Sequence, residues 1–376
     1  MHFRTLVTVN IPEVGPDIKT DREIQESIKN IEIAVERCDK DDIGQSVMKK
    51  ICLSRYKGMS NAFAREVYNA VDELLEPYCE STENPDYLEF EDHTDELKDE
   101  YENKSVDCIK LPEGRIVSIH NSIVLGKFTV RNGLVYQKQF GQLKNEKRSK
   151  SAKKMTALPN YPYKKLYKGF EDFAEEERYM DYNDKYKGYG YVYNPDAFYD
   201  WYCIGGRWPK MFLVKEDCID FTVGDRDYPN EYYKAPDGYK WTAAARKKDI
   251  QWKKMRRYFF DDAIQKYKRY KEIFETGVMP ENEYFIITDN SLKSFGSILY
   301  QKDETLTEYL NRTELKDRCK HEFSQYIHSY LQDGIYHCYD ECQRDDDADE
   351  MWRSMVDEYY ASLDDNTVLV SVDCHI

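Results

Sequence analysis

The chain has 376 residues, of which 41% are hydrophobic and 34% charged, and its mean hydropathy is −0.82. A net charge of −16 and a pI near 5.1 repel nucleic acid and anionic lipid, so we expect neither direct nucleic-acid binding nor membrane attachment. Ten cysteines without a regular spacing, and an N-terminus without a signal-peptide pattern, predict a reduced, cytoplasmic protein.

The N-terminal part combines one strand with several helices. Alternating apolar side chains predict a strand at 3–11, and an amphipathic pattern predicts a helix at 20–38. Two further helices are expected at 43–56 and 60–75. With the segment that follows them, they would form a helical insertion at 43–104.

Residues 80–102 are strongly acidic. The simpler interpretation is a solvated loop or helix. The sharper interpretation is a surface that mimics nucleic-acid phosphates and contacts a partner protein. Its side chains would be Glu89, Glu91, Asp92, Asp95, Glu96, Asp99, Glu100 and Glu102.

The next segment is rich in strand-forming residues. Asn132 and Gly133 predict a type I′ hairpin between strands at 128–131 and 134–137. The lysine-rich run that follows predicts an exposed basic loop at 141–155. We interpret this loop as too short, in so acidic a chain, to indicate nucleic-acid binding.

The second half predicts a long striped helix at 249–276, helices at 313–331 and 348–363, and a final strand at 367–374. Because both chain ends are strands beside helices, we expect them to pair. The predicted fold class is α+β, with a ferredoxin-like antiparallel sheet that pairs the N- and C-terminal strands and carries large helical and β-hairpin insertions. We expect one elaborated domain of residues 1–376.

The segment 194–214 has the most unusual composition. Pro195 begins it as a turn, aromatic and β-branched residues predict a strand at 198–204, and Gly205 with Gly206 allows positive φ and close approach of a ligand or backbone. One interpretation is an anion pocket with aromatic walls, an arginine anchor and a glycine nest, formed by Trp201, Tyr202, Gly205, Gly206, Arg207 and Trp208. The other is a bulged core strand whose arginine pairs with a structural carboxylate.

This segment resembles the motif N-P-x-A-x-x-D-W-Y-x-I-G-G-R-W of a family of uncharacterised proteins from phages and bacterial mobile elements. The matching residues are Asn194, Pro195, Ala197, Asp200, Trp201, Tyr202, Ile204, Gly205, Gly206, Arg207 and Trp208. Phe198 and Tyr199 depart from the Lys-Trp pair that is usual there. Members also end in Asp-Cys-His-Ile, as residues 373–376 do here. The resemblance covers the second half of the chain and implies a phage or mobile-element origin without an established activity.

The C-terminal strand offers a candidate acid–base pair. Asp373 and His375 share one face of the strand while Cys374 points to the other, and a carboxylate beside an imidazole can orient a general base. The alternative is an exposed strand edge without a role. Residues of zinc-binding type occur without a zinc-site spacing, namely Cys319, His321, His337, Cys338 and Cys342. We expect no metal and no cofactor, because no dinucleotide, P-loop, hydrolase or zincin motif occurs.

Two hypotheses follow. The first is a non-enzymatic, phage-derived binding protein in the host cytosol, which occupies a host protein through its acidic surface. The target would be a nucleic-acid-binding defence effector, as in an anti-CRISPR-like inhibitor. The second is a protein that binds or hydrolyses a nucleotide-like anion. In it Arg207 binds phosphate, Trp201 and Trp208 stack the base, and His375 with Asp373 transfers protons. The second hypothesis requires His375 to lie near Arg207 in space.

Overall fold

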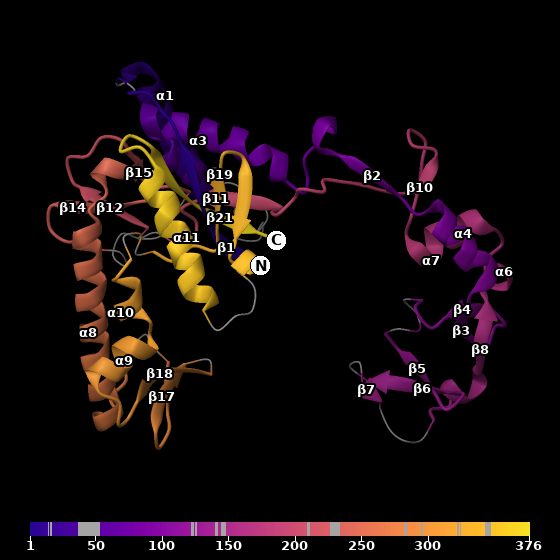
Figure 1. Ribbon diagram of the computed structural model, residues 1–376. Coiled ribbons are helices and arrows are strands. Elements are labelled where there is room, and N and C mark those ends of the chain that lie inside the picture. The colour runs from indigo at the N-terminus through magenta and orange to yellow at the C-terminus, as the bar shows by residue number, and fades with distance from the viewer. Residues whose placement is uncertain are drawn as a thin grey trace. The chain divides into compact units, whose positions relative to one another are not determined.

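The computed structural model describes Met1 to Ile376 except for residues 14, 16, 37–52, 122–123, 125, 140–141, 144–147, 209–210, 226–233, 282–283, 295, 322, 324 and 343–346. The described residues fall into two units (Figure 1). The first, which we call the body, joins Met1–Cys79 to Ala197–Ile376. The second, which we call the insert, is the continuous segment Glu80–Asp196.

A seven-stranded sheet forms the centre of the body. Its strands are β1 (His2–Val9), β11 (Trp201–Ile204), β13 (Phe221–Thr222), β15 (Ala244–Arg246), β19 (Ser329–Gln332), β20 (Ile335–Cys338) and β21 (Val368–His375). The first and last strands of the chain, β1 and β21, pair antiparallel along their whole length at the centre of the sheet. β19 lies parallel to β1 on its other side, and β15 and β11 pair with successive halves of the free edge of β21.

Helices cover both faces of this sheet, because its strands alternate between two apolar cores. The helices of the body include α1 (Ile18–Glu36), α3 (Ala62–Leu75), α8 (Trp252–Thr276), α9 (Leu306–Arg312), α10 (Leu315–Arg318) and α11 (Ala348–Ser362). Val7 and Val9 of β1 pack with α3 on one face, whereas Leu6 packs with α8 and α11 on the other. The ladder of β12 (Phe212–Lys215) with β14 (Tyr239–Thr242) joins the α8 side.

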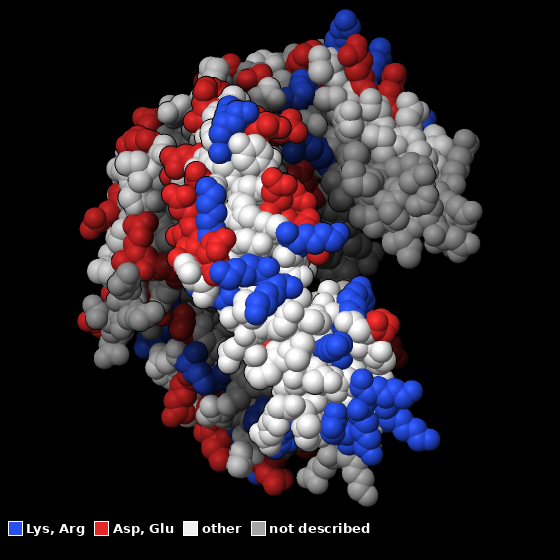
Figure 2. Space-filling view, turned by 90° about the vertical axis from the view of Figure 1, so that its right-hand side faces the viewer, with Lys and Arg blue, Asp and Glu red and all other residues white. Residues whose placement is uncertain are grey.

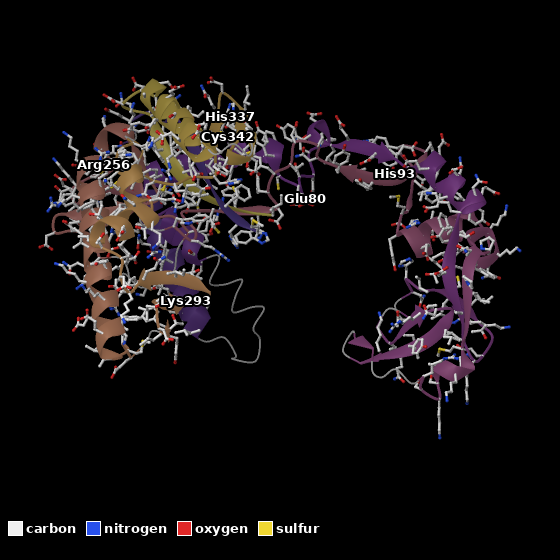
Figure 3. All side chains as sticks on the ribbon, turned by 60° about the horizontal axis from the view of Figure 1, so that its bottom comes forward. Glu80, His93, Arg256, Lys293, His337 and Cys342 are labelled. Atoms are coloured by element: carbon white, nitrogen blue, oxygen red, sulfur yellow. The ribbon has the colours of Figure 1, made fainter. Side chains whose placement is uncertain are left out.

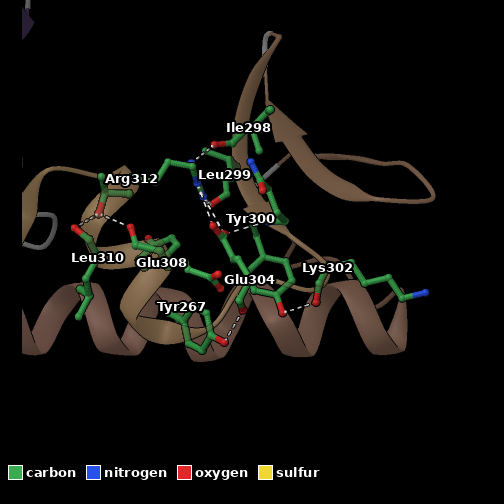
Figure 4. Close-up of polar contacts among 12 residues, drawn as sticks. Tyr267, Ile298, Leu299, Tyr300, Lys302, Glu304, Glu308, Leu310 and Arg312 are labelled. Atoms are coloured by element: carbon green, nitrogen blue, oxygen red, sulfur yellow. Dashed lines mark hydrogen bonds and ion pairs between the residues drawn. The ribbon is translucent and has the colours of Figure 1, made fainter.

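An ion pair between Glu304 and Arg312 holds a small hairpin and α9 against α8 (Figure 4). The elements there are α9 and the hairpin strands β16 (Ile286–Ile287), β17 (Ser291–Ser294) and β18 (Ser297–Gln301). Arg312 Nη2 lies 2.7 Å from Oε1 of the buried Glu304, and Arg312 Nη1 donates to the Ile298 carbonyl at 2.9 Å. Tyr267 of α8 donates its hydroxyl to the Glu304 carbonyl at 2.9 Å. Glu304 is therefore bonded to α9 through its carboxylate and to α8 through its carbonyl, and Arg312 bonds in turn to the hairpin.

The insert has two apolar cores of its own. Its strands are β2 (Glu89–Asp92), β3 (Ser105–Lys110), β4 (Ile116–Ser118), β5 (Phe128–Arg131), β6 (Leu134–Gln139), β7 (Gln142–Leu143), β8 (Thr156–Pro162), β9 (Tyr182–Asn183) and β10 (Gly188–Tyr193). Its helices are α4 (Thr94–Asn103), α6 (Tyr163–Leu166), α7 (Phe170–Arg178) and short 3-10 turns that include Ala152–Lys154. One core lies under β3, β5 and β6, and the other joins α4 to α7 and β10.

The α+β class is confirmed, and so is the pairing of the chain ends. The sheet is mixed rather than antiparallel as expected, because β1 and β19 run parallel. A ferredoxin-like arrangement is not confirmed, since it splits its parallel strands with a third strand whereas β1 and β19 are direct neighbours. In the described part of the chain, no helix is long and apolar enough to cross a bilayer.

Several expected elements are found, and one is wrong. Asn132 and Gly133 have φ of 50° and 68°, as the expected type I′ hairpin requires. The helix expected at 313–331 is instead α10 followed by β19, because the segment supplies a neighbour for β1. The expected helical insertion 43–104 and basic loop 141–155 lie partly outside the described residues, and the expectation of one domain stays a prediction.

Removing residues 80–196 and joining 79 to 197 through a short Gly-Ser linker is expected to leave the body folded. The chain leaves and re-enters the body at neighbouring points, because Phe198 N donates to Tyr78 O at 3.1 Å and Cys79 pairs with Tyr199 in an isolated bridge. Far-UV circular dichroism and a cooperative thermal transition check this. Aggregation of the shortened protein would show that the body depends on the insert.

Candidate functional site

The register of three strands brings the predicted site residues together at one end of the large sheet. β21 pairs with β11 on one side and with β1 on the other, which aligns Trp201, His375 and His2 in one row. The next row on the same face holds Asp373 and Arg4, two residues further along their strands. This face is the one that α8 and α11 cover elsewhere, and we call these residues, with Asp200, the terminal histidine site.

Two histidine–aspartate pairs form the polar part of this site. His2 Nδ1 lies 2.9 Å from Asp373 Oδ1, and His375 Nδ1 lies 2.9 Å from Asp200 Oδ1. The two imidazoles meet edge to face with centroids 4.7 Å apart, and Trp201 stacks on His375 at 5.1 Å. Each carboxylate therefore orients one imidazole through Nδ1.

The two carboxylates differ in their surroundings. Burial opposes ionisation of Asp200, but hydrogen bonds from His375 and from the Trp201 amide outweigh it and lower the pKa of Asp200. Asp373 is only 2% exposed and is held by His2 and by a backbone amide. A buried carboxylate requires such donors, because an unpaired charge in the interior is costly.

The paired glycines form the turn that holds Asp373. Gly205 and Gly206 have φ of 80° and 47°, and the turn aims the Arg207 amide at Asp373 Oδ2 at 2.8 Å. A Cβ at Gly206 would lie 2.2 Å from Asp373 Cβ. One amide of this turn thus holds the protein's own carboxylate, and the glycine nest expected for an external anion stays a prediction.

The other predicted ligand-binding residues divide between the two faces of the sheet. Tyr202 lies on the opposite face, where burial and the neighbouring Asp72 raise its pKa. Cys374 lies on that face too, opposite to His375, and burial raises its pKa to about 12. Trp201 is 45% exposed, and the Arg207 side chain is also exposed.

A cavity of about 550 Å³ adjoins the site through His2. Its walls include Phe198, Trp208 and Tyr336, and its polar lining includes Arg4 and Asp340. The Arg4 guanidinium lies 4.8 Å from the ring centroid of Trp208. We call this space the terminal cavity. It has mainly aromatic walls with a few polar groups, which is typical of small-molecule sites.

The acidic surface predicted for partner binding lies on β2 and α4 of the insert, whereas the terminal histidine site belongs to the body. Most of its carboxylates already have local partners. Contacts form from Glu91 to Tyr191 and His93, from Asp92 to the Thr94 amide, from Asp95 to Lys98, from Glu96 to His93, from Asp99 to Asn103, from Glu100 to Arg178 and from Glu102 to Lys164. Glu89 is exposed on β2.

The residues of zinc-binding type have other contacts. His337 stacks on Tyr330, and Cys342 lies against Met355; Figure 3 labels His337 and Cys342. His321 Nδ1 lies 2.8 Å from Asp357 Oδ2. Over the described ranges, no three His, Cys, Asp or Glu residues gather in a way that could hold a metal ion.

Sequence reasoning missed His2, Arg4 and the role of Asp200. Asp200 is part of the central motif, but only the register of β11 with β21 shows that it meets His375. His2 could have been found by aligning the two terminal strands in register once their pairing was expected. Comparison with protein-family models, with curated proteins and with solved structures finds no match.

Gly206→Ala is expected to lower the free energy of unfolding by about 3 kcal/mol, because a left-handed alanine is strained and its Cβ would displace Asp373. Gly277→Ala is the matched control. Gly277 has φ of 68° but open space around it, so only the backbone strain of about 1–2 kcal/mol remains. Urea unfolding measures both variants. Equal losses would show that the approach of Asp373 is unimportant.

Proposed function

We propose that the protein binds a nucleotide-like anion in the terminal cavity, with His2 placed for proton transfer. The observation that carries this is a chain of contacts at the cavity edge, in which the Arg207 amide holds Asp373 and Asp373 holds His2 Nδ1. Within the described residues His2 Nε2 has no hydrogen bond. A carboxylate on Nδ1 with Nε2 left for a ligand is the arrangement of a general base.

The walls of the terminal cavity suit a planar base with an anionic group. Phe198 and Tyr336 stack on each other at 4.0 Å, and Trp208 forms another aromatic wall. Arg4 supplies a cationic guanidinium that suits phosphate or carboxylate. The cavity volume lies within the range of about 300–1,000 Å³ that small-ligand sites occupy.

Trp208→Leu is expected to weaken nucleotide binding about tenfold, which corresponds to about 1.4 kcal/mol and matches the loss of one stacking contact. Isothermal titration with AMP, ATP and UMP measures it. Tyr284→Leu is the control, since Tyr284 is an exposed aromatic residue of the body that does not line the cavity. It is expected to change the affinity less than about twofold.

Two results would contradict this proposal. Absence of heat with every nucleotide at millimolar concentration would remove nucleotide binding. Loss of binding in Trp201→Leu and Arg207→Ala, with Trp208→Leu unaffected, would instead place the ligand on the exposed face of β11, as the sequence hypothesis had it. Turnover that is lost in His2→Asn while binding persists would assign His2 to proton transfer.

A second candidate function is the binding of a host protein through the acidic surface of β2 and α4. What favours it is the exposure of Glu89, Asp95 and Glu96 on the insert, together with the resemblance to a phage family. In this proposal the protein acts in the host cytosol, and its target is a nucleic-acid-binding defence effector whose cationic groove these carboxylates occupy, as in anti-CRISPR-like inhibition.

Replacing Glu89, Asp95 and Glu96 by Lys is expected to abolish capture of such a partner, because the interaction depends on charge complementarity. The matched control replaces Glu272, Glu275 and Asp289 of the body, which are equally exposed and change the net charge by the same amount. Affinity purification from host lysate with quantitative mass spectrometry checks this. Equal capture by both triple variants would exclude the acidic surface as the contact.

A further inference from the structure

The charges of the insert are strongly segregated along its sequence. Residues 110–169, which we call the basic lobe, contain 14 Lys or Arg but only 2 Asp or Glu, in a chain whose net charge is −16. Figure 2 shows the face of the insert, with Lys and Arg gathered over its lower part and most Asp and Glu above them. The net charge of the chain therefore does not describe this region.

Strand register brings basic residues of the lobe together from three separate segments. β3 pairs with β4 on one side and with β8 on the other, so Lys110 lies opposite both Ile116 and Thr156. Arg115 directly precedes that position of β4, and Lys154 comes two residues before that position of β8. Neighbouring strands lie about 4.8 Å apart, so these cations form one cluster at a sheet end.

The basic side chains of the lobe are exposed and carry few carboxylate partners. Those exposed are Lys110, Arg115, Lys127, Arg131, Lys150, Lys153, Lys154, Lys164, Lys165 and Lys168. Among the residues that the structure describes, only Lys164 of this set forms an ion pair, with Glu102. At the other end of the insert, by contrast, Arg178 is paired with Glu100. The cations of the lobe are thus left for an external anion.

The backbone that carries these cations is well supported. Arg148 donates to the carbonyls of Val135 and Ala152 at 3.0 and 2.9 Å, which fixes the turn with Lys153 and Lys154 onto β6. Ala152 and Val135 are fully buried in the same core. The backbone at Lys153 and Lys154 is therefore ordered before binding, so that only their side chains lose conformational freedom when they bind.

We propose that the basic lobe docks the phosphate backbone of a nucleic-acid duplex. Its cationic side chains match the regular phosphates of a duplex, and the β5–β6 ribbon, with Arg131 at its tip, has the shape that grooves admit. Within the described part of the lobe, no Phe, Tyr or Trp ring is among the strongly exposed side chains, so the aromatic stacking platform that is typical of single-strand binding is missing. Carboxylates more than about 10 Å from a bound duplex repel it only weakly at 0.1 M salt, because screening weakens the interaction over that distance.

The test is fluorescence anisotropy of the full-length protein with a short labelled DNA duplex, and with duplex RNA in parallel. We expect a Kd of about 10⁻⁶ M near 50 mM salt, weakening steeply toward 200 mM. Lys153→Glu with Lys154→Glu is expected to weaken binding at least about tenfold and to reduce the log–log salt slope by about 2. Circular dichroism confirms that the variant is folded.

The matched control is Lys185→Glu with Lys187→Glu, which makes the same change in charge at exposed positions of the insert outside the lobe. It is expected to keep binding within about twofold of wild type. Equal weakening by both double variants, or no anisotropy change with either duplex, would overturn the proposal. So would equal affinity for a poly-glutamate peptide, or self-association that the lobe variant abolishes, because an acidic peptide or a second copy would then be the occupant.

Discussion

The antiparallel pairing of β1 with β21 is the contact on which the rest of the body depends. It joins the two ends of the chain at the centre of the large sheet; β11, β15 and β19 pair directly with one of these two strands, and β13 and β20 extend the sheet from β15 and β19. The same register decides which side chains share a face. Leu6 and Leu369 enter the core beside α8 and α11, while His2, Asp373 and His375 occupy the end of that same face.

The buried carboxylate of Asp373 explains why the central motif has its composition. A carboxylate that is 2% exposed must be satisfied by donors, and the available ones are His2 and the amide of Arg207. Only a residue without a Cβ can bring that amide so close, which accounts for Gly206. The turn of this motif therefore satisfies the buried carboxylate of Asp373. Through Asp373 it also sets the position of the His2 imidazole at the terminal cavity.

Local patterns predicted the elements that depend on local chemistry. The hairpin at Asn132-Gly133, the long helix α8 and the two terminal strands all follow from spacing or turn residues. The helix predicted at 313–331 was wrong at Tyr330 and Leu331. The apolar spacing there also fits a helix, and the segment forms a strand because it pairs with the open edge of β1. A signal was present in Asp333-Gly334, whose φ of 52° and 76° form the β19–β20 turn.

Candidate sites were predictable only as far as they lie within one segment. Trp201 and Arg207 were visible as a motif, whereas the meeting of Asp200 with His375 and of His2 with Asp373 required the register of β11, β21 and β1. The basic lobe shows the same limit for charge. Considered alone, the run near Lys153 is short, but strand pairing adds cations from β3 and β4. Because a ligand senses charge only over roughly one Debye length, the fold and not the composition decides which charge it meets.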